Sequence, residues 1–262
     1  MREPSYKGPA IVTEGLVKSF GADNVLDGVN LVVERGEVLV VIGISGCGKS
    51  TLLRSIIGAY TLDDGTIRLL GRDVSSASEE EWLPLRKRMG VLFQQGALYT
   101  SMTVGENVAL PMREHTELAE PVIEIMVRMK LDLVGLGGTE GLMPAQLSGG
   151  MQKRVALARA LALDPEIMFY DEPTTGLDPI MAGAVNRLII DFNRKLSVTS
   201  LVITQDMNCC YAVASRVVML HEGKIHFSGS VDALRSTDDP VVRQFVEGRP
   251  DGPVRHRAAA AG

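Results

Sequence analysis

The sequence predicts an α/β fold, and three neighbouring features of one short stretch support this prediction. Residues 38–42 are an apolar, β-branched run, which is typical of a strand buried on both faces. A glycine-rich segment follows and ends in Gly48-Lys49-Ser50, and residues 52–57 continue as a helix. This order of strand, loop and helix is the context that the pattern G-x-x-x-x-G-K-[ST] needs to cradle phosphate groups. We therefore predict that the chain binds a nucleoside triphosphate.

The loop residues predicted to surround the phosphates are Gly43, Ser45, Gly46, Cys47, Gly48, Lys49, Ser50 and Thr51. Glycines let successive backbone N–H groups turn towards phosphate oxygens, because a Cβ would block the approach. The following helix N-terminus adds roughly half a positive charge. We expect Lys49 to reach the β- and γ-phosphates, Ser50 to ligate Mg²⁺ and Thr51 to contact the α-phosphate. A glycine-rich turn that matches by chance is disfavoured, because strand, loop and helix are all in place.

The composition is that of a globular protein with a substantial core. Of the 262 residues, 45% are hydrophobic and 23% are charged, so we expect one large α/β domain. The net charge of −5 gives no general electrostatic case for nucleic acid. The apolar runs are shorter than the roughly 20 residues of a membrane span, and the first residues lack the apolar core of a signal peptide. We therefore expect a cytosolic protein, in which Cys209 and Cys210 are buried apolar residues.

The rest of the chain is expected to alternate strands and helices. Strands are predicted at 10–18 and 30–34, joined by a turn at 21–24, and at 66–70, 89–93, 167–170 and 199–204. Helical periodicity over 104–129 is expected to be interrupted at Pro111 and Pro121, and further helices run to 163 and to about 195. Residues 72–81 are predicted to be a polar loop, and 248–262 an extended tail without a core of its own.

Two adjacent acids, Asp171 and Glu172, follow the apolar strand predicted at 167–170. Asp171 is placed to hold Mg²⁺, directly or through water, and Glu172 to polarise the attacking water. A capped turn also places acids after a strand. The phosphate loop elsewhere in the chain favours the catalytic interpretation.

Three further positions are suggestive on residue type. Gln94 ends a predicted strand and could touch Mg²⁺ or the attacking water, which is weak evidence by itself. Phe20 follows the first strand and could stack on an adenine ring, although residue type alone favours a hydrophobic plug. Ser148-Gly149-Gly150 opens a helix and predicts a second anion-binding terminus, which is unusual in one chain.

Taken together, these motifs resemble the ATP-binding subunit of ABC transporters. They occur in the family's order and cover nearly the whole chain: residues 43–51, Gln94, 147–152, 167–172 and 176–178. The resemblance implies a P-loop NTPase (RecA-like) core with an antiparallel β-subdomain and an inserted helical subdomain. It implies an ATP-binding domain over 1–247 with the helical subdomain at about 96–160, and a C-terminal extension over 248–262 that contacts the dimer partner. ATP and Mg²⁺ are the implied cofactors.

The resemblance also implies roles for individual residues. Two copies would face each other, so that Ser148, Gly149 and Gly150 of one copy hold the γ-phosphate bound to the other. Phe20 becomes the adenine platform, Gln94 the coupling glutamine and Mg²⁺ contact, and Asp178 a nucleotide-site residue. Met151 replaces the glutamine usual in the signature sequence.

A closer resemblance is to the ATPase of the bacterial Mla phospholipid transporter (maintenance of lipid asymmetry, Mce-type). It rests on Phe93–Leu98, Thr103–Val108, Pro111–Thr116, Leu142–Pro144, Val242–Phe245 and Asp251–Val254. It implies phospholipid transport between inner and outer membranes, peripheral attachment to the cytoplasmic side of the inner membrane, and four kinds of partner: a second copy, integral permeases, a small STAS-domain regulator and an Mce-domain lipid carrier. A permease is expected to dock near 94–103. The ending, Arg255-His256-Arg257 and an alanine run, departs from the aromatic ending expected.

The main departure from the family pattern is Gln205, where a histidine is expected to contact the γ-phosphate and orient Glu172. A glutamine amide donates a hydrogen bond but carries no proton or charge. We predict hydrolysis at a reduced rate. Three alternatives remain at this point: an ABC ATPase of another transporter, such as an amino-acid importer or a lipoprotein-release machine; a soluble ABC ATPase acting on DNA or ribosomes; and a slow-hydrolysing regulatory switch.

Overall fold

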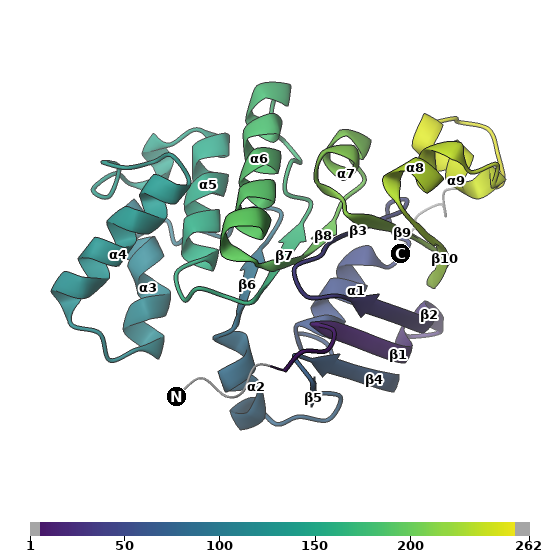
Figure 1. Ribbon diagram of the computed structural model, residues 1–262, viewed down its shortest axis with the longest axis horizontal. Coiled ribbons are helices and arrows are strands. Elements are labelled where there is room, and N and C mark those ends of the chain that lie inside the picture. The colour runs from purple at the N-terminus through teal and green to yellow at the C-terminus, as the bar shows by residue number, and fades with distance from the viewer. Residues whose placement is uncertain (1–5, 255–262) are drawn as a thin grey trace. The chain divides into compact units, whose positions relative to one another are not determined.

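The structure is a computed structural model that describes residues 6–254. The chain divides into two compact units, of which the first takes in the chain up to Ala77 and from Ile203 on, and the second is Ser78–Val202 (Figure 1). The predicted α/β fold is confirmed, with antiparallel and parallel strands both present. Among residues 6–254 no helix is long and apolar enough to cross a bilayer.

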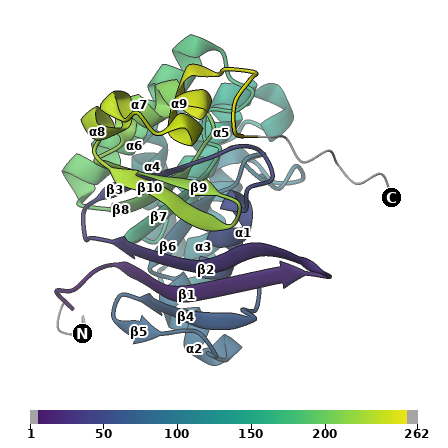
Figure 2. The ribbon, with the colours of Figure 1, turned by 90° about the vertical axis from the view of Figure 1, so that its right-hand side faces the viewer.

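An antiparallel sheet in the first unit contains the N-terminal hairpin (Figure 2). Its order is β2-β1-β4-β5, formed by β1 (Ile11–Phe20), β2 (Asp23–Val33), β4 (Asp64–Leu69) and β5 (Arg72–Asp73). The strand predicted at 30–34 is therefore too short, and the turn is only Gly21–Ala22. Pairing with β1 extends β2, because its N-terminal half gains ladder hydrogen bonds that the local pattern does not reveal.

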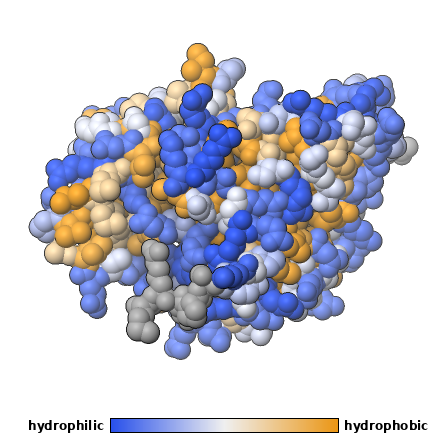
Figure 3. Space-filling view, in the orientation of Figure 1, coloured by the Kyte–Doolittle hydropathy of each residue, from blue (hydrophilic) through white to orange (hydrophobic). Residues whose placement is uncertain are grey.

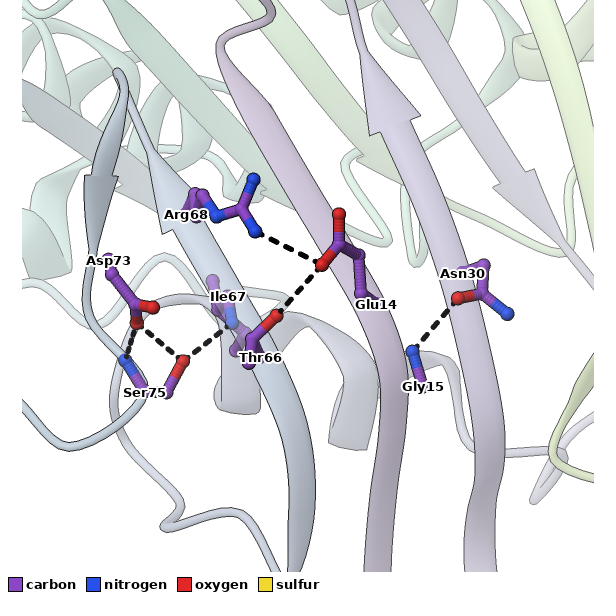
Figure 4. A network of polar contacts seen from close by, with 8 residues as sticks. All are labelled: Glu14, Gly15, Asn30, Thr66, Ile67, Arg68, Asp73 and Ser75. Atoms are coloured by element: carbon purple, nitrogen blue, oxygen red, sulfur yellow. Dashed lines mark hydrogen bonds and ion pairs between the residues drawn. The ribbon is translucent and has the colours of Figure 1, made fainter.

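Polar side chains join the neighbouring strands of this sheet on its exposed face (Figure 4). The Glu14 carboxylate of β1 accepts hydrogen bonds from Arg68 at 3.1 Å and from Thr66 at 3.5 Å, both in β4. The Asp73 carboxylate of β5 accepts a 2.7 Å bond from the Ser75 hydroxyl, which itself accepts from a β4 backbone N–H. Exposed polar contacts of this kind each contribute little to the free energy of unfolding, so the stability of the sheet depends mainly on its buried face.

The remaining strands of the first unit are arranged around β3 (Val38–Ile42), whose five residues are all buried. β9 (Arg216–His221) pairs with it in parallel, and β10 (Lys224–Gly229) pairs with β9 in an antiparallel hairpin. This explains the continuous apolar run of β3, since both of its faces are covered. The helices of this unit are α1 (Lys49–Ile56), α7 (Met207–Val213), α8 (Val231–Ser236) and α9 (Pro240–Glu247).

The second unit contains strands in the order β8-β7-β6, with helices α2 to α6. β6 (Met89–Leu92) and β7 (Ile167–Asp171) are parallel, and β8 is Thr199–Ile203, whose last residue the division assigns to the first unit. The helices are α2 (Glu79–Arg86), α3 (Val104–His115), α4 (Glu120–Leu133), α5 (Gly149–Ala160) and α6 (Pro179–Leu196), with a 3₁₀ turn at Pro144–Gln146.

The polar loop predicted at 72–81 is wrong at both of its ends. Its first two residues form β5, and α2 already begins at Glu79. Ser78 caps this helix, because its hydroxyl accepts from the Glu81 N–H while the Glu81 carboxylate accepts from the Ser78 N–H. This capping box is a sequence signal for the start of a helix. The prediction missed it because a polar segment is also typical of a loop.

The interruption predicted at Pro111 is also wrong. Pro111 lies inside α3, and the chain leaves the helix only after His115. A buried side chain, Asn107, holds the start of this helix by donating to three carbonyl groups and accepting from the Tyr99 N–H. A capping box at Thr103 adds to this, so one lost backbone bond does not end the helix. Pro121 lies in the first turn of α4, where its missing N–H costs nothing.

The predicted extended tail is wrong for the part that the structure describes. Val254 is only 8% exposed, and its N–H donates to the Gln244 side chain at 2.7 Å. The Gln244 amide donates back to the Val254 carbonyl at 3.1 Å. The chain therefore returns to α9 at this point. The Arg255–His256–Arg257 ending and the alanine run lie outside the described residues, as does the beginning of the segment searched for a signal peptide.

One face of α4 is apolar although it is exposed. Val122, Ile125, Met129 and Leu133 repeat at helical spacing and have exposed fractions between 42% and 60%. Apolar atoms gather on the surface where this helix lies (Figure 3). A contiguous apolar helix face of this kind is typical of a surface that contacts another molecule.

Candidate functional site

The phosphate loop has a backbone that only glycine adopts easily. Gly43, Gly46 and Gly48 have φ values of 153°, 79° and 108°. Two of them are also closely surrounded: a Cβ on Gly43 would lie 2.4 Å from the Leu220 carbonyl oxygen, and one on Gly48 would lie 2.7 Å from the Val25 carbonyl oxygen. Glycine is therefore needed here for two reasons: the backbone dihedral angles, and the closeness of neighbouring carbonyl oxygens.

Lys49 is held at this loop. It is 7% exposed, and its Nζ donates to the carbonyl oxygens of Gly43 at 2.7 Å and Ile44 at 2.9 Å. Cys47 lies beside it, and burial raises the pKa of the Cys47 thiol, against the opposing effect of the Lys49 charge. The cysteine therefore remains a neutral thiol near neutral pH, and the lysine supplies the positive charge.

The N-terminus of α1 fits an anionic group. Its N-cap residue is Gly48, which has no side chain to accept from the first-turn N–H groups. The first turn, Lys49-Ser50-Thr51, contains no acid and provides one cation and two hydroxyls. Backbone N–H groups, a lysine and hydroxyls are the donors that a triphosphate requires, so the residues present fit this group.

Two more predicted site residues belong to the first unit. Phe20 ends β1 and is 46% exposed. Its ring lies edge-on to Tyr60 at 5.3 Å between centroids, with the Lys18 ammonium 5.4 Å from the ring centroid. An exposed ring beside a cation suits stacking better than the alternative of a buried plug. Gln205 follows β8 at an exposed position, and the next residue, Asp206, caps α7.

The predicted acids lie together at the end of β7 in the second unit. Asp171 and Glu172 are 5% and 7% exposed. Glu172 has a φ of 49°, which is uncommon for a residue with a side chain. The Thr175 hydroxyl donates to its carboxylate at 3.3 Å. Buried, strained and held by a neighbour, this acid has the environment of a functional residue.

The predicted second anion terminus is the start of α5. Ser148 is its N-cap, and its hydroxyl accepts from the Met151 N–H at 3.3 Å. Ser148 and Gly149 are exposed, whereas Gly150 is buried, and a Cβ there would lie 2.4 Å from the Met181 side chain. The exposed N-terminal turn of α5 can therefore approach an anion on another molecule.

The remaining predicted residues are Gln94 and Asp178. Gln94 lies just beyond β6 and is exposed. Asp178 is the N-cap of α6, where its carboxylate accepts from the N–H groups of Ile180 at 2.9 Å and Met181 at 3.0 Å. The structure therefore gives Asp178 a capping role, and its contact with nucleotide stays a prediction.

Sequence reasoning missed two residues beside the acids, Lys153 and Thr175. Lys153 of α5 is 7% exposed and donates to backbone carbonyls of the segment that follows β7. Burial lowers its pKa, against the opposing effect of the Glu172 charge. The available signal was a lysine directly after the motif 147–152, on the helix that this motif opens.

Comparison with known proteins agrees with these features. The family model described as "ABC transporter" matches residues 26–175. The chain is 45% identical over 236 residues to "Intermembrane phospholipid transport system ATP-binding protein MlaF" of Escherichia coli (strain K12), covering 90% of this chain and 88% of that protein. It is 44% identical over 247 residues to "Probable ribonucleotide transport ATP-binding protein mkl" of Mycobacterium leprae (strain TN), covering 94% and 71%.

Solved structures agree with the fold. The "Dimeric structure of a post-hydrolysis state of the ATP-binding cassette MJ0796 bound to ADP and Pi" has a TM-score of 0.78 at 28% identity and covers 84% of this chain and 98% of that chain. The structure of cbiO1 from Clostridium perfringens, part of the ABC transporter complex cbiONQ, has a TM-score of 0.81 at 26% identity and covers 93% and 96%. From its motifs, its fold and these relatives, the chain belongs to the ABC transporter family.

Proposed function

We propose that this chain is the ATP-hydrolysing subunit of a transporter that moves phospholipid between the inner and outer membranes. As a member of the ABC transporter family it is an ATPase. The single observation that carries the catalytic part is the buried, strained acid Glu172, in a chain that also contains a complete phosphate loop. The cargo is inferred from the MlaF relative, whose alignment covers 90% of this chain.

Nucleotide binding is assigned to the first unit. The backbone N–H groups around Gly46 and Gly48 donate to the phosphates, and Lys49 neutralises the β- and γ-phosphates. Thr51 contacts the α-phosphate. Phe20 offers an exposed ring for the adenine.

Hydrolysis is assigned to Glu172, Gln94 and Gln205. Glu172 accepts the proton of the attacking water, and Gln94 and Gln205 donate or accept hydrogen bonds around it. Mg²⁺ is held by hard oxygen donors. The donors proposed here are the Ser50 hydroxyl, the Gln94 amide oxygen and the Asp171 carboxylate. When bound, that ion would neutralise charge on the phosphate oxygens.

The signature segment is proposed to act on a second copy of the chain. Ser148, Gly149 and Gly150 form an exposed helix N-terminus that would meet the γ-phosphate held by the partner copy. The solved MJ0796 cassette, described as dimeric and bound to ADP and Pi, supports this arrangement. Asp178 is proposed to lie near the same nucleotide. ATP would then bridge two chains, and hydrolysis would release the bridge.

Partners and location follow from the same proposal. A permease in the inner membrane would dock near 94–103, where Tyr99 is 52% exposed. A small STAS-domain regulator and an Mce-domain carrier complete the proposed assembly, with this chain peripheral on the cytoplasmic side. The domain limits, 1–247 with a helical subdomain at about 96–160 and an extension from 248, are proposed on the same basis.

Glu172→Gln tests the catalytic role. We expect ATP affinity to stay within about twofold, while turnover falls by roughly 10²–10⁴, because the amide cannot accept the proton. Steady-state phosphate release and nucleotide binding measure the two effects. Glu166→Gln, which alters a half-buried acid of the same unit that binds Arg88, is the matched control. Turnover near the wild-type rate in the Glu172 variant would remove this residue from the base role.

Affinity purification from solubilised native membranes tests the cargo and the partners. Recovery of a permease, an Mce-domain protein and phospholipid, identified by mass spectrometry, is the expected result. Since one relative is named for ribonucleotide transport, the eluate is also analysed for nucleotides other than ATP and ADP. A permease without an Mce-domain protein or phospholipid would leave the ATPase assignment standing and overturn the phospholipid assignment.

A further inference from the structure

The Lys153 side chain connects α5 to the segment that carries Glu172. Its Nζ donates to the carbonyl oxygens of Thr175 at 2.6 Å, Pro173 at 3.0 Å and Glu172 at 3.4 Å. An ammonium group has three donors, and all three are directed at this one turn of backbone. The residue is 7% exposed, so these bonds compete little with water.

The turn that Lys153 binds has a conformation that needs support. Glu172 sits at a φ of 49°, a region that costs free energy for a residue with a Cβ and persists only where the surroundings enforce it. Within the turn, the Thr175 N–H donates to the Glu172 carbonyl at 3.2 Å, and its hydroxyl donates to the Glu172 carboxylate at 3.3 Å. Lys153 binds the carbonyl of Thr175 itself, so it holds the residue that orients the acid.

We propose that Lys153 is a positioning residue for hydrolysis, which holds the turn 172–175 so that the Glu172 carboxylate keeps its productive orientation. The proposal rests on the proposed function, in which Glu172 is the base. The proposal also links the two ends of this contact. Lys153 lies in α5, five residues after its N-cap Ser148, so a displacement of the N-terminus of α5 would move the turn that carries Glu172.

Lys153→Met tests the proposal, because it keeps an unbranched, buried side chain and removes all three donors. We expect turnover to fall by about 10- to 100-fold with ATP affinity unchanged within about twofold, since small misplacements of a reacting group have effects of this size. Lys153→Arg keeps a cation with donors, and we expect its turnover to lie closer to wild type than that of the Met variant.

Lys130→Met is the matched control for loss of a buried lysine. Lys130 is 6% exposed in the same unit, and its ammonium binds the Asp164 carboxylate instead of the turn. We expect this variant to keep wild-type turnover. Thermal unfolding of both Met variants shows whether they fold, and an equal loss of turnover in the two would overturn the positioning role.

A double-mutant cycle separates positioning from general damage. In the Glu172→Gln background, Lys153→Met should lower the residual turnover by less than about twofold, because the group it positions is already absent. A full additional loss would overturn the proposal. Failure of the proposed function would look different, because Glu172→Gln alone would then keep its turnover while the effect of Lys153→Met stayed the same in both backgrounds.

Discussion

Gln205 is the residue at which this chain departs most from the pattern that its motifs otherwise follow. It is exposed just beyond β8, and an amide at this position provides a hydrogen bond without a charge. The phosphate loop and both acids, Asp171 and Glu172, are present, so the other groups proposed for hydrolysis are retained. The expected consequence is slower hydrolysis with nucleotide binding preserved.

Gln205→His should raise turnover by about tenfold or more, because an imidazole can carry the charge and proton that the amide cannot. Steady-state phosphate release from pH 6 to 9 is the measurement, and the gain should vary with the protonation of the new histidine. Asn208→His, at a nearby exposed position of α7, is the control and should change nothing. Unchanged turnover in Gln205→His would show that this position does not limit hydrolysis.

At the scale of elements, the clearest unexpected contact is between α9 and the segment that follows it. Gln244 is 7% exposed and binds both backbone groups of Val254, as a neighbouring strand would. Gly252 is close to the same amide: a Cβ there would lie 2.3 Å from Gln244 Oε1. Two of the segments on which the resemblance rests, Val242–Phe245 and Asp251–Val254, therefore contact each other through Gln244.

Gln244→Ala should lower the free energy of unfolding by about 1–3 kcal/mol, because two buried backbone groups of Val254 lose their partner. Hydrogen exchange should show faster exchange of the Val254 amide, and chemical denaturation measures the stability change. Arg243→Ala removes an exposed side chain of the same helix and is the control. Slow exchange of Val254 in the Gln244 variant would contradict the proposed anchoring.

At the scale of the whole molecule, the proposed function requires two copies. The exposed turn at Ser148 is proposed to meet the nucleotide held by a second copy. Association would then depend on ATP, because the triphosphate provides the contacts on both sides.

The Glu172→Gln variant should form a dimer with ATP and a monomer with ADP, since we expect it to bind ATP and cleave it only slowly. Adding Ser148→Arg should abolish the dimer while the monomer still binds ATP. Light scattering after size-exclusion chromatography gives the mass. Ser230→Arg, which likewise removes an N-cap serine but at α8, is the control and should leave the dimer intact. A dimer that persists with Ser148→Arg would contradict the shared site.

The features that the sequence alone determined are local ones. Three glycine positions, a lysine and a helix start specify the phosphate loop within a few residues, because backbone dihedral angles and helix termini depend on neighbours in the chain. The acids at the end of β7 are recognisable for the same reason: an apolar run is followed directly by Asp171 and Glu172.

Other features depended on tertiary structure. Lys153 finds its carbonyl partners 19 to 22 residues away, Gln244 finds Val254 10 residues away, and α3 continues through Pro111 because buried contacts outweigh one lost bond. Chain pattern shows that a lysine or glutamine is present, but packing decides which backbone groups surround it once water is removed. The sequence therefore determined the residues proposed for nucleotide binding and hydrolysis, and the tertiary structure decided how the proposed catalytic acid, Glu172, is held.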